Sequence, residues 1–121
     1  MRLTYWLMLF LFGFLGVAVL IFRPVPIPEE EDCLIATGTV VQIYEAGVKD
    51  VVFRLKDQAR SFYINRGLER GLDLAKLRGQ LINQEITIKY PKYWTPLDPG
   101  NATRHVSKIE FNGETIFTEI N

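Results

Sequence analysis

The sequence predicts one apolar N-terminal helix followed by a mainly-β (β+α) domain that contains a single short helix. Three observations support this fold class. Residues 3–22 carry no charged side chain, residues 34 onward alternate apolar with polar positions, and residues 74–81 contain leucines at helical spacing. These patterns divide the chain into a transmembrane anchor (1–23), a proline-rich and acidic linker (24–33) and a β domain (34–121).

The uncharged segment from Leu3 to Phe22 is long enough to cross a bilayer, because twenty helical residues cover about 30 Å. Arg2 and Arg23 bracket it, and no small-residue cleavage site follows it. We therefore expect an uncleaved, single-pass anchor in the lipid bilayer. The positive charge at the N-terminus favours an inner (cytoplasmic) membrane with the C-terminal domain outside the cytoplasm. The alternating prolines at 24, 26 and 28 predict a stiff, extended spacer.

The first half of the β domain predicts three strands. A long strand covers residues 34–44, and Gly38 within it indicates a bulge or a bend. Strands at 51–56 and 61–65 follow, separated by a turn near Asp57. In the first strand, five residues share one phase of the alternation: Ile35, Thr37, Thr39, Val41 and Ile43.

The second half predicts one helix and three further strands. Asp73 is suited to cap the helix, and Asn83 can end it in a left-handed conformation. A strand at 85–90 and a proline-rich connection at 91–104 follow. The last two strands flank Asn112-Gly113, which predicts a tight hairpin in which Ile109 faces Ile116.

The inner phases of these elements predict the hydrophobic core. Its expected members are Phe53, Leu55, Phe62, Ile64, Leu77, Ile86, Ile88, Ile109 and Ile116.

This order of elements resembles the OB-fold, a five-stranded barrel with one short helix between strands 3 and 4. The resemblance covers residues 34–121 and depends on element order, the bend glycine and the helix position. It implies that ligands bind on the outer face of the second and third strands and on the adjoining loops.

A membrane-tethered barrel of this kind also resembles the haem chaperones of cytochrome c maturation. Those proteins attach haem through a histidine followed four residues later by a tyrosine. Here Ile109 stands four residues after His105. We therefore expect neither haem nor any other cofactor.

Composition weighs against catalysis and nucleic-acid binding. The chain has one histidine, one cysteine and a formal net charge of zero, and it contains no glycine-rich phosphate loop or metal-ligand spacing. We expect no enzyme, no metal site and no nucleic-acid partner. Cys33 is expected to be a free thiol, with an intermolecular disulfide as the alternative, and His105 a surface or loop-capping residue.

Two surfaces are candidates for binding. The first is the outer face of the second and third strands, where Arg54 and Lys56 would neighbour Tyr63. The second is the connection that contains Tyr93 and Trp94, although Trp94 could instead plug the end of the barrel. Ordinary solvated charges are the alternative for the first surface.

These surfaces leave three functions open. The one we expect is a membrane-anchored binding or scaffold module that acts by contact with a protein partner. The alternatives are a tethered carrier or chaperone for a small or polymeric anion, and a nucleic-acid-binding OB domain if the domain faces the cytoplasm.

Overall fold

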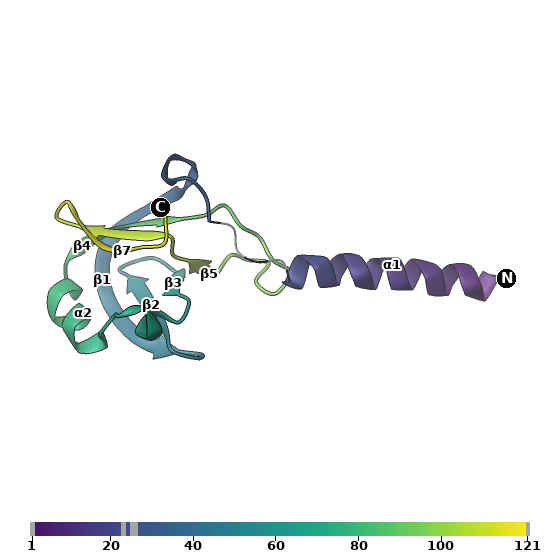
Figure 1. The fold of residues 1–121 in the computed structure, drawn as a ribbon, viewed down its shortest axis with the longest axis horizontal. Coiled ribbons are helices and arrows are strands. Elements are labelled where there is room, and N and C mark those ends of the chain that lie inside the picture. Colours follow the sequence, from purple (N-terminus) through teal and green to yellow (C-terminus); the bar gives the residue numbers. More distant parts are fainter. Residues whose placement is uncertain (1, 23, 25–26, 121) are drawn as a thin grey trace.

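An apolar helix extends from a β-rich domain in the computed structural model, which describes residues 2–22, 24 and 27–120 (Figure 1). Helix α1 (Arg2–Phe22) has 21 residues, none of them buried, and its most apolar window has a mean hydropathy of 2.4. It is long and apolar enough to cross a membrane, as the sequence predicts. Arg23 and positions 25–26 of the expected spacer lie outside the described residues.

A mixed β-sheet forms the domain, with seven strands in the described residues rather than the five expected. The strand order is β5-β3-β2-β1-β4-β6-β7, and β3 and β5 run parallel while the other neighbours are antiparallel. The strands are β1 (Leu34–Ala46), β2 (Asp50–Leu55), β3 (Ser61–Ile64), β4 (Glu85–Tyr90), β5 (Thr103–His105), β6 (Lys108–Phe111) and β7 (Glu114–Thr118).

Two features account for the difference from a five-stranded barrel. Strand β7 is added as the second arm of the final hairpin, and the expected fifth strand changes partner midway. The amide of Val106 donates to the carbonyl of Tyr63 in β3, whereas the amide of Ser107 donates to the carbonyl of Lys89 in β4, both at 2.8 Å. The strand is therefore divided into β5, which pairs with β3, and β6, which pairs with β4. This short segment connects the two sides of the sheet.

Strand β1 belongs to both sides, because its first half pairs with β4 and its second half with β2. A bulge between Val40 and Gln42 reverses the phase of its side chains. Ile35 and Val41 are therefore exposed while Ile43 is buried, so the single phase expected for these residues is wrong. Gly38 lies before the bulge, where a Cβ atom would meet the Leu55 side chain at 3.3 Å.

The helix and the hairpin turn confirm their local signals. Helix α2 (Leu74–Leu81) begins where the Asp73 carboxylate accepts a bond from the amide of Lys76 at 3.0 Å. Asn83 follows the helix with φ of +65°, as expected for a left-handed stop. Asn112 and Gly113 also have positive φ. Two short 3₁₀ helices, η1 (Glu30–Asp32) and η2 (Gly67–Arg70), complete the elements.

The core contains eight of the nine expected residues, and the ninth, Ile116, is partly buried against it. The expected hairpin register is wrong, because a bulge after Ile109 pairs that residue with Phe117 instead of Ile116. The inner faces predicted for β2, β3 and β4 are correct.

Candidate functional site

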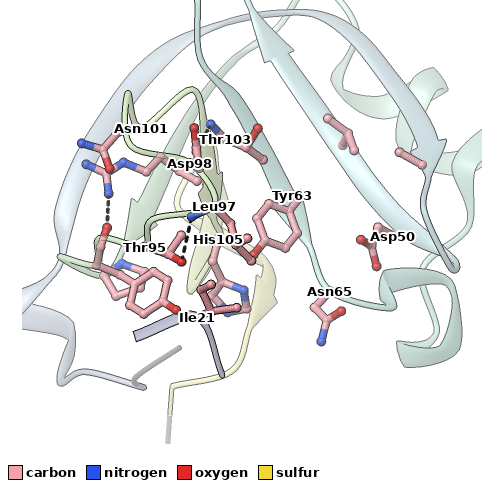
Figure 2. Close-up of a pocket in the computed structure, with 15 residues that line it drawn as sticks. Ile21, Asp50, Tyr63, Asn65, Thr95, Leu97, Asp98, Asn101, Thr103 and His105 are labelled. Carbon is pink, nitrogen blue, oxygen red and sulfur yellow. Dashed lines mark hydrogen bonds between the residues drawn. The ribbon is translucent and has the colours of Figure 1, made fainter. Parts of the chain in front are cut away.

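A cavity of about 510 Å³ lies between the outer face of β2 and β3 and the connection of residues 91–102, here called the β4–β5 connection (Figure 2). Its walls come from four parts of the chain. The residues that line it include Ile21, Val52, Tyr63, Tyr93, Leu97 and His105.

Strand pairing builds the floor of this cavity. Tyr63 lies between Val52 of β2 and His105 of β5, and its ring packs edge-on against the imidazole with centroids 5.5 Å apart. Val52, expected on the solvent side of its strand, is only 5% exposed. Burial raises the pKa of Tyr63, and the nearby carboxylate of Asp50 raises it further. Its hydroxyl is therefore neutral at physiological pH and can donate or accept a hydrogen bond.

The β4–β5 connection is held in one shape by its own hydrogen bonds. The carboxylate of Asp98 accepts from the amides of Ala102 and Thr103 at 3.0 and 2.8 Å. The indole of Trp94 donates to the carbonyl of Pro99 at 3.2 Å. The connection is therefore organised before it meets a partner, which reduces the entropy lost on binding.

Arg104 secures the same connection to the β-sheet domain. Its guanidinium donates to the carbonyl of Tyr93 at 2.7 Å and lies 5.3 Å from the centre of the Tyr90 ring. The buried Nε atom of Arg104 has no hydrogen-bond partner. Because this cation is engaged by the fold, it is not positioned as an open anion site.

The side chain of His105 is half-buried and lies against Glu119, which follows β7. Its Nε2 atom lies 2.6 Å from Oε1 of Glu119, and the two side chains are 11% and 8% exposed. Arg70 approaches the other oxygen of Glu119 at 3.8 Å. This network fixes the imidazole that forms one side of the cavity floor.

The structure brings together two of the five predicted site residues. Tyr63 and Tyr93 both line the cavity, whereas Arg54, Lys56 and Trp94 do not. Arg54 is paired with Ser61 rather than with Tyr63, and Lys56 lies exposed just beyond β2. Trp94 is 45% exposed and outside the core, so it does not plug the barrel.

Sequence reasoning missed Val52 and His105 as cavity residues. Leu97 lay within the second candidate surface but was not singled out. The parallel pairing of β5 with β3 positions His105, and no local sequence signal predicts such long-range pairing. Leu97 belongs to a proline-rich stretch without periodicity. Only the aromatic content of that stretch indicated a binding surface.

The chemistry of the cavity suits binding. Most of the surface that lines it is apolar. The lining also contains two carboxylates, from Asp50 and Asp98, and one guanidinium, from Arg104. Within the described residues, no group of three or more His, Cys, Asp and Glu side chains could hold a metal ion. Comparison of the chain with known protein families, with curated proteins and with solved structures gave no match, so the geometry of this cavity carries the functional argument.

Proposed function

We propose that this chain is a membrane-anchored binding or scaffold module whose OB-like barrel acts by contact with a protein partner. Helix α1 anchors it in the inner membrane, and the domain lies outside the cytoplasm. The OB-like assignment is supported by the order of three strands, α2, β4 and then β5 with β6 acting together as the fifth strand. Strand β7 is an addition at the end of this order.

One observation carries the proposal. The cavity lies where the outer face of β2 and β3 meets the β4–β5 connection, which is where OB-folds usually bind their ligands. Both predicted surfaces contribute to it, through Tyr63 on the strand and Tyr93 on the connection. Aromatic side chains in a preorganised wall are typical anchors of protein interfaces.

The charges of the cavity favour a peptide segment over an anion. The two carboxylates of Asp50 and Asp98, against the one guanidinium of Arg104, would repel a phosphate or carboxylate ligand. Arg54 and Lys56, which the carrier and nucleic-acid alternatives require, are not part of the lining. The partner segment would present apolar side chains together with backbone or basic groups.

Site-specific photocrosslinking in the full-length, membrane-bound chain tests this proposal. Benzoylphenylalanine replaces Tyr93 in one variant and Val41, an exposed residue on β1 outside the cavity, in the control. We expect a discrete protein adduct from position 93 and none from position 41. The proposal fails if neither position gives an adduct or if both give the same one.

A charge variant separates protein contact from the anion-carrier alternative. In the position-93 variant, combined Arg54→Ala and Lys56→Ala should leave the adduct unchanged, and added salt should have little effect. Exposed charges act mainly through attraction that salt screens. An adduct that disappears in this double variant, and that salt also removes, would favour the carrier.

A further inference from the structure

The linker is attached to the domain at a defined point. The carboxylate of Glu30 in η1 accepts hydrogen bonds from Lys108 and from Lys89, the latter at 3.1 Å. Lys89 is the penultimate residue of β4, and Tyr90, the last one, pairs with Leu34 at the start of β1. The linker therefore meets the domain at the end of the sheet where the β4–β5 connection begins.

Chain length keeps this end of the domain close to the membrane. Phe22 ends α1 and Glu30 is fixed on the domain, so eight Cα-to-Cα steps separate them. Fully extended, they span at most about 29 Å. Chain length therefore sets an upper limit on how far Glu30, and with it the start of the β4–β5 connection, can lie from the end of α1.

The β4–β5 connection also points toward α1. In Figure 1 it extends from β4 to the end of the helix, while α2 lies on the opposite side of the domain. Ile21 of α1 lines the same cavity as Tyr93 and Leu97 (Figure 2). The connection presents large apolar side chains to solvent, with Leu97 70% and Trp94 45% exposed.

We propose that the β4–β5 connection docks on the lipid bilayer, with Trp94 and Leu97 among the headgroups and upper acyl chains of the leaflet from which α1 emerges. Tryptophan is suited to this depth because its ring is apolar and its N–H is polar. Leucine buries its side chain below the headgroups. Docking fixes the orientation of the domain and places the cavity at the membrane surface. The inference rests on α1 spanning the membrane but not on the identity of the cavity's partner.

Tryptophan quenching in the full-length chain tests the docking. The chain has two tryptophans, Trp6 and Trp94, so Trp6→Phe leaves Trp94 as the only reporter. The protein is reconstituted into phosphatidylcholine vesicles with bromine near either the headgroup end or the methyl end of the acyl chains. Trp94 should lose most fluorescence to the shallow bromine. The variant with Trp6→Phe, Trp94→Phe and Gln80→Trp, which places the reporter on an exposed position of α2, should lose none.

A single substitution tests the apolar contact. Leu97→Asp in the Trp6→Phe chain should greatly reduce quenching of Trp94, whereas Val41→Asp, at an exposed apolar position on β1, should not. Near-ultraviolet circular dichroism checks that both variants remain folded. Three results would each overturn the docking. Trp94 could be quenched no more strongly than the α2 reporter, it could be quenched more strongly by the deep bromine, or its quenching could be unchanged by Leu97→Asp.

Trp6 in the Trp94→Phe chain reports separately on insertion of α1. If Trp6 is quenched and Trp94 is not, α1 is inserted and only the docking is wrong. If Trp6 is not quenched, α1 does not span, and the anchor proposal fails together with the docking.

Discussion

Truncation of Phe53 to alanine should remove a large part of the stability of the domain. Phe53 lies in β2, an interior strand of the sheet, and is fully buried, between Ile43 of β1 and Phe62 of β3. Both neighbours are themselves at most 2% exposed, so little movement could fill the space left by the ring. Removing a buried phenylalanine side chain costs about 3–5 kcal/mol, from lost burial and from the cavity that remains.

That cost is at least about a fifth of the 5–15 kcal/mol by which domains of this size are usually stable. The measurement is urea denaturation of the full-length chain in detergent, followed by the far-ultraviolet circular dichroism of the β domain. Val41→Ala, at a 47% exposed position, is the control and should change the free energy of unfolding by less than about 0.5 kcal/mol. A loss below about 1 kcal/mol for Phe53→Ala would refute the assigned strand faces.

Three further predictions concern the bend, the linker and the thiol. Gly38→Ala should destabilise the domain by about 1–3 kcal/mol in the same assay, because its Cβ would lie 3.3 Å from the Leu55 side chain, which is buried and has little room to move. Gly79→Ala in α2, with open space around it, should not destabilise it. Hydrogen bonds from its two lysine partners lower the pKa of Glu30 below 4.5, so Glu30 stabilises the linker contact above that pH and loses this effect as the pH falls. The denaturation midpoints of wild type and Glu30→Gln should therefore differ at pH 7 and converge in acid, and an equal difference at both would contradict the contact. Burial raises the pKa of the Cys33 thiol above 9.0, so an impermeant maleimide should label it slowly at neutral pH and faster as the pH rises. If the domain lies outside the cytoplasm, this labelling should occur on intact cells. Labelling only after lysis would reverse the proposed orientation.

Local sequence signals determined most elements of this fold. The apolar span, the Asp73 cap and the Asn112-Gly113 turn each depend on residues close together in the chain, and all three are present. The inner faces of β2 and β3 were predictable for the same reason, since alternation alone places Phe53 with Leu55, and Phe62 with Ile64, on one face of each strand. Such signals require no knowledge of which strands will pair.

Long-range pairing decided what the sequence could not. The bulge after Val40 changes which residues of β1 face the core, and the switch at Val106 divides one expected strand into two. The same pairing places His105 beside Tyr63, and the β4–β5 connection forms the opposite wall of the cavity. The sequence marked Tyr63 and Tyr93 as candidates, although they are 30 residues apart in the chain. Only the tertiary structure brought them to one cavity, because strand partners and loop paths are set by packing over the whole domain rather than by neighbouring residues.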